Sequence, residues 1–209
     1  MRLGVFAPVT GPVLPYDHTM EPLLTTSRLQ LVAIERRHLT GLRDLWTDPR
    51  VMTNVGFPRG LDPADLHLER YESPDAVSAP PGRRRGSHMA VETADGTFLG
   101  EAKLGAPDDD GTCEPDVKLL PAWWRHGFGE EIVRALVEES FQRWPDCARV
   151  RFTPNVENDA ARRLYTKVGA HDVGEGQDPP GSTPLRGFVG VRYRILEIER
   201  PPEGDAPPT

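Results

Sequence analysis

The stretch that decides the fold runs from Glu114 to Trp144 and reads EPDVKLLPAWWRHGFGEEIVRALVEESFQRW. Its apolar segment at residues 117–120 is closed by Pro121, a pattern typical of a strand that ends at a proline. The segment after it repeats apolar residues at intervals of three and four, which predicts a helix with one buried face. The residues of that face are Val133, Leu136, Val137, Phe141 and Trp144.

Two glycines, Gly127 and Gly129, lie between the predicted strand and the predicted helix. The first N–H groups of a helix have no partner within the helix, and they carry the positive end of its dipole. Glycine also lets a bulky anion come close to the main chain. We therefore expect the turn at residues 125–130 to bind an anion, and a diphosphate suits that chemistry.

Residues 117–129, VKLLPAWWRHGFG, resemble the acetyl-coenzyme A signature of the GNAT N-acetyltransferases, whose core pattern is Arg/Gln-x-x-Gly-x-Gly/Ala. Trp124 stands where Arg or Gln is usual, although the Pro-x-x-Trp form is familiar in the branch that includes ribosomal-protein N-terminal acetyltransferases. Main-chain N–H groups do the binding, so this change does not remove the mechanism. The resemblance implies coenzyme contacts at Val117, Lys118, Leu119, Arg125, His126, Gly127, Phe128, Gly129 and Glu130.

Residues 158–170, NDAARRLYTKVGA, resemble the family segment Asn-x-x-Ala/Ser-x-x-x-Tyr-x-Lys-x-Gly-Phe, with Ala170 in place of Phe. Helix-end chemistry independently predicts a helix between a cap at Asn158 and a stop at Gly169. The resemblance implies that Asn158 contacts the pantetheine and that Tyr165 is the general acid. A phenol with an ordinary pKa of about 10 is protonated at neutral pH and can donate. The alternative for Tyr165 is a residue that only packs against the sheet.

The general base is less defined in the sequence. Glu114 and Asp116 lie on the predicted strand before the turn, and Glu101 lies on the neighbouring one. Alternation places Glu114 and Asp116 on one face of their strand if no bulge intervenes. We prefer Glu114, which matches an acidic residue common in the ribosomal-protein branch, while Asp116, Glu101 and ordered water remain alternatives.

The rest of the chain reads as short strands and helices. The pattern predicts an edge strand at 28–32, a helix around 39–46 and a helix within 61–71 that is capped by Asp62. It also predicts hairpin strands at 88–92 and 97–104, a turn at 108–111 and strands at 112–120 and 148–153. A loop at 177–184 and a final strand containing Val189, Val191, Tyr193 and Ile195 follow.

The resemblance covers about residues 23–198 and implies a fold class, α/β (α+β). In that GNAT fold a central, twisted, mostly antiparallel mixed sheet is flanked by helices. The sheet is splayed between two strands, here 112–120 and 148–153, and the splay admits pantetheine. The length of 209 residues suits one domain at 21–200. We expect a flexible extension at 1–20 and a flexible tail at 201–209.

Composition excludes several other classes. A formal charge of −7 disfavours nucleic-acid binding, which needs a basic face. Cys113, Cys147 and the scattered histidines have no metal-ligand spacing, so we expect no metal. No long apolar run or secretory signal pattern is present, which predicts a cytoplasmic protein without a membrane partner. The run Arg83-Arg84-Arg85 reads as a solvated loop, with contact to the coenzyme 3′-phosphate or an acidic partner as the alternative.

These features together predict an acetyl-CoA-dependent N-acetyltransferase that acts by direct transfer in a ternary complex. The acceptor is a primary amine, either a protein N-terminus or a small molecule. A binding module or sensor that holds acetyl-CoA without efficient catalysis is the alternative. Trp123 and Trp124, beside Phe128, read as packing anchors of the turn, and a contact to substrate or to a second copy in a homodimer is the other option.

Overall fold

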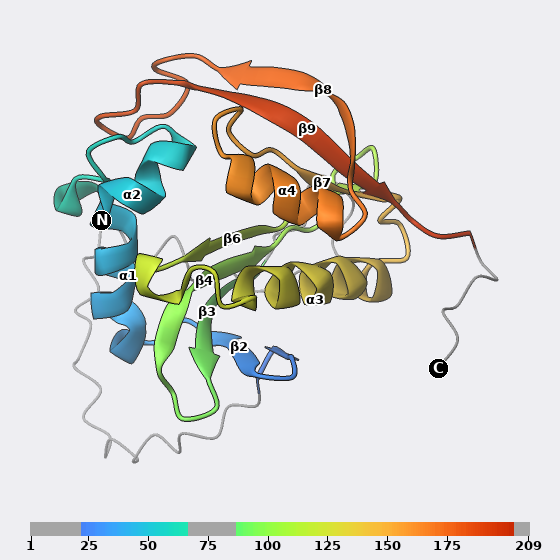
Figure 1. Cartoon of the computed structure of the whole chain (residues 1–209), viewed down its shortest axis with the longest axis horizontal. Helices are drawn as coiled ribbons and strands as arrows, with labels where there is room; N and C mark the ends of the chain where they lie inside the picture. Colours follow the sequence, from blue (N-terminus) through green and yellow to red (C-terminus); the bar gives the residue numbers. More distant parts are fainter. Residues whose placement is uncertain (1–21, 67–86, 203–209) are drawn as a thin grey trace, which may run out of the picture.

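The computed structural model describes residues 22–66 and 87–202 (Figure 1). The expected extension at 1–20, the run Arg83-Arg84-Arg85 and most of the expected tail lie outside these residues. Along the chain the elements are β1 (Leu24–Thr25), β2 (Leu29–Ala33), η1 (Arg36–His38), α1 (Leu39–Thr47), α2 (Pro49–Met52), η2 (Thr53–Val55), η3 (Pro63–Asp65), β3 (Ser87–Thr93), β4 (Phe98–Leu104), β5 (Thr112–Cys113), β6 (Asp116–Leu119), η5 (Pro121–Trp123), α3 (Phe128–Arg143), β7 (Arg149–Phe152), α4 (Asp159–Lys167), β8 (His171–Asp178) and β9 (Val191–Glu199), where η marks 3-10 helices.

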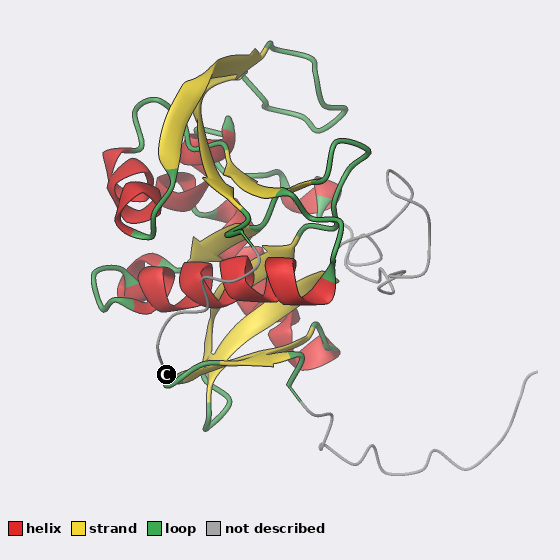
Figure 2. Ribbon diagram, turned by 90° about the vertical axis from the view of Figure 1, so that its right-hand side faces the viewer, coloured by secondary structure: helices red, strands yellow, loops and turns green. Residues whose placement is uncertain are grey.

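The strands form two sheets. The first has the order β1-β2-β3-β4-β6 and is antiparallel throughout, whereas the second has the order β5-β7-β9-β8 and pairs β5 with β7 in parallel. Both views show α3 between the β8–β9 strands above and the β3–β4 hairpin below (Figures 1 and 2). The mixed, mostly antiparallel α/β class predicted from the sequence is confirmed.

The predicted strand at 112–120 is divided between the two sheets, and its description as one strand was wrong. Thr112 and Cys113 pair with β7 in the second sheet, while Asp116–Leu119 pairs with β4 in the first. Pro115 lies at the break, where its missing N–H cannot support a ladder. This break separates the two sheets, so β6 ends its sheet with one edge that no other described strand covers.

The main core lies where α3 and α4 pack against the strands. Ile132, Val133 and Leu136 of α3 are fully or almost fully buried together with sheet residues such as Leu31 and Leu99. Burying side chains of this size stabilises a fold by about 1.5–3 kcal/mol each. The apolar stripe predicted for this helix is therefore confirmed, with Ile132 added to it.

Helix α1 covers the other face of the first sheet. On β4 the neighbours Glu101 and Ala102 point to opposite faces. Ala102 belongs to the main core, whereas Glu101 accepts a hydrogen bond from Trp46 of α1. A smaller apolar cluster follows at α2 and η2, where Met52 and Phe57 are buried.

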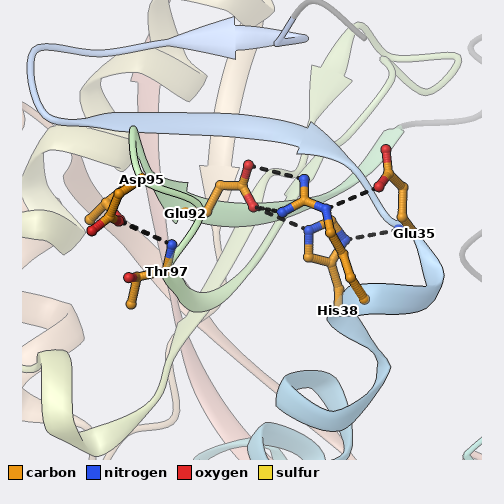
Figure 3. Close-up of polar contacts among 7 residues, drawn as sticks. Glu35, His38, Glu92, Asp95 and Thr97 are labelled. Carbon is orange, nitrogen blue, oxygen red and sulfur yellow. Dashed lines mark hydrogen bonds and ion pairs between the residues drawn. The ribbon is translucent and has the colours of Figure 1, made fainter. Parts of the chain in front are cut away.

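A polar network joins η1 to β3 (Figure 3). Glu92 accepts hydrogen bonds from both guanidinium ends of Arg37, at 2.6 and 3.1 Å, and lies 3.2 Å from His38 Nε2. His38 Nδ1 accepts the N–H of Glu35, which leaves Nε2 as the donor to Glu92. This network ties the segment before α1 to the sheet.

Several smaller predictions need correction. The strand predicted at the edge, β2, lies between β1 and β3, because residues 24–25 add a further strand outside it. Within the described residues the helix predicted at 61–71 is only η3, whose cap at Asp62 is as predicted. The predicted loop at 177–184 begins later, because β8 extends to Asp178. Val189 precedes β9 and is 57% exposed.

Candidate active site

A cavity of about 690 Å³ opens beside the free edge of β6. Its walls come from β6 and the turn after it, the start of α3, the end of β7, α4 and the α2–η2 segment. A second hollow of about 540 Å³ lies beside α4, is lined mainly by charged side chains such as Arg162 and Arg163, and includes none of residues 114–130. The first cavity is therefore the one that joins the two predicted motifs.

Strand β6 presents main-chain groups to this cavity. Leu120 N–H donates to the Leu99 carbonyl at 2.9 Å, and strand alternation then turns the main chain of Val117 and Leu119 toward the free edge. Asp116 Oδ1 accepts the Val117 N–H, and the Leu119 carbonyl accepts the Trp124 indole N–H. Among the described residues, no hydrogen bond engages the Val117 carbonyl or the Leu119 N–H.

The turn after β6 is shaped by left-handed backbone. Arg125 has φ 64° and Gly127 has φ 81°, and Gly127 is the N-cap of α3 without a side-chain cap. The first helical bond runs from Glu131 N–H to the Gly127 carbonyl at 3.2 Å. The N–H groups of Phe128, Gly129 and Glu130 therefore have no helical partner. The turn has the free donors that the sequence predicts for an anion site.

A set of hydrogen bonds from the β1–β2 turn holds this loop in place. Glu131 accepts from the Thr26 and Ser27 hydroxyls, from Arg28 N–H and from Arg28 Nε, at 2.6–3.0 Å. Arg28 Nη1 in turn donates to the His126 carbonyl at 3.1 Å, and its guanidinium lies 4.4 Å from the centre of the Phe128 ring. The sequence does not predict this contact, because the partners of Glu131 lie about a hundred residues away.

Helix α4 contributes Asn158 and Tyr165. The Asn158 side chain caps the helix by accepting the Ala161 N–H at 3.1 Å, as predicted. Tyr165 is buried, and its ring stacks on Phe152 of β7 with centroids 4.2 Å apart. Burial and the negative charge of Asp116 raise the pKa of the Tyr165 phenol well above its ordinary value. Tyr165 lines the cavity, and its hydroxyl donates to no other described residue.

The cavity also contains paired charges. Asp116 forms an ion pair with Lys118. Removal from water raises the pKa of the Asp116 carboxyl, but the positive charges of Lys118 and Lys103 outweigh this and hold the pKa below its ordinary value. Glu114 is 53% exposed at its side chain and lies 3.8 Å from Arg151.

The predicted site residues divide into two groups. Those that line the cavity are Glu114, Val117, Lys118, Leu119, Arg125, Gly129, Asn158 and Tyr165. His126, Gly127, Phe128 and Glu130 belong to the turn but are not among the lining residues. Glu130 instead binds Lys167 at 2.6 Å and Arg134 at 3.1 Å, which links α3 to the end of α4. Glu101 lies outside the cavity, buried against Trp46 and His88.

Two further walls were not predicted. Lys103 at the end of β4 and Arg151 on β7 line the cavity, as do Val51, Asn54 and Val55 of the α2–η2 segment. The pairing of β4 with β6 places Lys103 at the cavity, and the pairing of β5 with β7 places Arg151 there. The residues that the structure describes contain no cluster of potential metal ligands and no helix long and apolar enough to cross a membrane.

Comparison with known proteins identifies the class. Residues 28–171 match the family model described as an acetyltransferase (GNAT) domain. This span exceeds half of the chain and contains both sequence motifs, so the protein belongs to the GNAT acetyltransferase family. The enzyme class and the family predicted from the sequence are confirmed. A search of curated proteins gives no match.

Solved structures show the same fold. Spermidine N-acetyltransferase from Vibrio cholerae, in complex with CoA and spermine, shares 20% identity and a TM-score of 0.62 over 83% of this chain and 96% of that one. A GNAT-family acetyltransferase from Bacillus anthracis shares 15% identity and 0.61 over 84% and 97%. RimL, a ribosomal L7/L12 alpha-N-protein acetyltransferase in complex with coenzyme A, shares 13% identity and a TM-score of 0.60 over 86% of this chain and 98% of that one.

Proposed function

We propose that this protein transfers the acetyl group of acetyl-CoA to a primary amine by direct transfer in a ternary complex. A C–N bond forms as the C–S bond breaks, the amine loses a proton, and the departing thiolate gains one. The observation that carries the proposal is that one cavity is lined by β6, by the start of α3 and by Tyr165 of α4. The two motifs begin about forty residues apart in the sequence, and residues of both line this cavity.

The coenzyme fits the donors of this chain. The free N–H groups of Phe128, Gly129 and Glu130 suit a diphosphate at the positive end of the α3 dipole. Gly129 lies beside Leu164 of α4, and a Cβ at this position would be 3.4 Å from the leucine side chain. Along β6, the Leu119 N–H and the Val117 carbonyl suit an amide-bearing chain such as pantetheine, with Asn158 on the opposite wall.

Tyr165 is proposed as the general acid. Its raised pKa keeps the phenol protonated at neutral pH, and the stacking on Phe152 fixes the ring. A positioned acid that protonates the leaving thiolate contributes roughly 100- to 10,000-fold to a rate. Burial of a tyrosine for packing alone would place the hydroxyl against a protein acceptor, and no described residue accepts from it.

Glu114 is proposed as the group that receives the amine and its proton, directly or through water. Glu101 is unsuitable because Trp46 and His88 occupy its carboxylate outside the cavity. Asp116 is held in an ion pair with Lys118, and its lowered pKa makes it a weak base. Glu114 lines the cavity and remains accessible to solvent.

The test separates binding from catalysis. We expect Tyr165→Phe to lower kcat by roughly 100-fold or more in a thiol-release assay with an amine panel, while calorimetry gives an unchanged Kd for CoA. Tyr193→Phe is the matched control, because Tyr193 lies on β9 outside the cavity. If the protein binds CoA but acetylates no amine, it is an acetyl-CoA sensor. If Tyr165→Phe acetylates at the native rate, Tyr165 is not the acid.

A further inference from the structure

The cavity contains more cationic than anionic side chains. Among the described lining residues, the cationic ones are Lys103, Lys118, Arg125 and Arg151, and the carboxylates are Glu114 and Asp116. A cavity with this balance attracts an anionic group and repels a second positive charge. The excess therefore bears on the identity of the acceptor.

Three of the four cations already have a role. Lys118 pairs with Asp116. Arg151 donates to Glu197 at 2.7 Å and lies 3.8 Å from Glu114. Arg125 lies in the turn beside the proposed diphosphate donors, so the anionic coenzyme accounts for its charge.

Lys103 is the remaining cation. It sits at the end of β4 directly across from Asp116, is half-buried and lines the cavity. Asp116 is already held by Lys118, and Lys103 forms no ion pair or hydrogen bond with any residue in the described part of the chain. A partly desolvated ammonium group is stabilised by an anion, and residues 22–66 and 87–202 supply none in direct contact with Lys103.

We propose that the acceptor is a small primary amine that carries its own carboxylate, and that Lys103 binds this carboxylate while Glu114 receives the amine. This rests on the proposed function. Val51 and Val55 give the same cavity an apolar wall, and Asn54 adds an amide to it. The site thus suits an amino acid or a short acidic peptide better than a polyamine. A polyamine would place further positive charges near Lys103 and Arg151, where the two lining carboxylates, Glu114 and Asp116, already lie beside cationic side chains.

The experiment compares matched acceptors. Butylamine and 4-aminobutyrate differ by a carboxylate that is far enough from the amine to leave the basicity of the amine similar. A second comparison, of free α-amino acids with dipeptides that begin with an acidic residue, shows whether the acceptor is an amino acid or a short acidic peptide. We expect carboxylated amines to exceed their matched amines and spermidine in kcat/KM. Lys103→Met should lower kcat/KM for the carboxylated amines roughly 10- to 100-fold and leave butylamine within about twofold. Lys103→Arg should retain the preference.

Two results would overturn the inference. One is an equal kcat/KM for 4-aminobutyrate and butylamine in the native enzyme, and the other is an equal effect of Lys103→Met on both. In either case, acetylation of amines that lack a carboxylate would still support the proposed function. If no amine is acetylated, calorimetry measures how tightly the CoA complex binds the same amines. Binding of a carboxylated amine with the same affinity in Lys103→Met and in the native protein also contradicts the inference.

Discussion

Trp124 departs from the family pattern, yet its side chain forms a hydrogen bond within the turn. It stands where Arg or Gln is usual, and only main-chain groups were expected to matter there. The structure gives the side chain a function of its own, because its indole N–H donates to the Leu119 carbonyl at 2.7 Å. The ring is 39% exposed, whereas Trp123 and Phe128 pack against the main core. Of the two tryptophans, only Trp123 is thus a packing anchor of the turn.

His38 makes stability depend on pH. It is 2% exposed, and burial lowers the pKa of its imidazole below the ordinary 6.5, against the opposing effect of Glu92. Below pH 6.5 the unfolded chain therefore binds a proton that the folded chain does not. The free energy of unfolding therefore does not depend on the protonation of His38 above pH 6.5. As the pH falls below 6.5, it decreases by up to about 1.4 kcal/mol per pH unit.

Urea unfolding at pH 7.5 and at pH 5.5 measures this loss. His38→Gln should reduce the difference in unfolding free energy between the two pH values, because no group at this position then titrates. His171→Gln is the control, since His171 is an exposed histidine on β8. If His38→Gln and the native protein show the same difference in unfolding free energy between pH 7.5 and pH 5.5, His38 does not cause the pH dependence.

The N-terminus of α3 is the element on which the proposed coenzyme binding depends. It follows a turn with two left-handed residues and has no side-chain cap, so its conformation needs support from elsewhere. Glu131 and Arg28 provide that support through the β1–β2 turn. This explains why residues 24–28 lie beside a helix a hundred positions later in the chain.

Glu131→Gln tests this support. Burial raises the pKa of the Glu131 carboxyl, but hydrogen bonds from Thr26, Arg28 and Ser27 outweigh it and lower the pKa to about 2 from an ordinary 4.5. The stabilisation is complete above pH 4.5 and is lost as the pH falls toward 2. We expect Glu131→Gln to lower the unfolding free energy by about 1–3 kcal/mol at pH 7 and to weaken CoA binding several-fold.

Glu138→Gln is the control on the same helix, because Glu138 is exposed and forms no hydrogen bond or ion pair within the described residues. Chemical denaturation gives the stability and calorimetry the affinity for CoA. Equal stability and affinity in Glu131→Gln and the native protein would show that the turn keeps its shape without this support.

At the scale of the whole molecule, local patterns predicted the class of fold better than its connections. Periodicity and end signals located α3, α4, β7 and the β3–β4 hairpin, because each depends on residues close in sequence. Strand β8 was missed, since its sequence HDVGEGQD has few apolar residues and its long pairing with β9 holds it in place. Likewise, the division of residues 112–119 between two sheets depends on partners distant in sequence.

The candidate site follows the same rule. Most of the site residues were predicted by resemblance, and eight of the predicted site residues line one cavity. Lys103, Arg151 and the α2–η2 wall could not be predicted, because they come from elements that meet only when the two sheets are placed side by side. Because these residues carry the proposal about the acceptor, that proposal depends on the structure and could not be made from the sequence.

The central claim is that the main-chain N–H groups at the start of α3 hold the diphosphate of the coenzyme. Amide-resolved NMR during titration with CoA measures this directly. We predict that the amides of residues 127–130 shift most, together with that of Leu119, and that pantetheine, which lacks the diphosphate, shifts Leu119 but leaves residues 128–130 unchanged. Saturation with CoA without a shift at residues 128–130 would contradict the account.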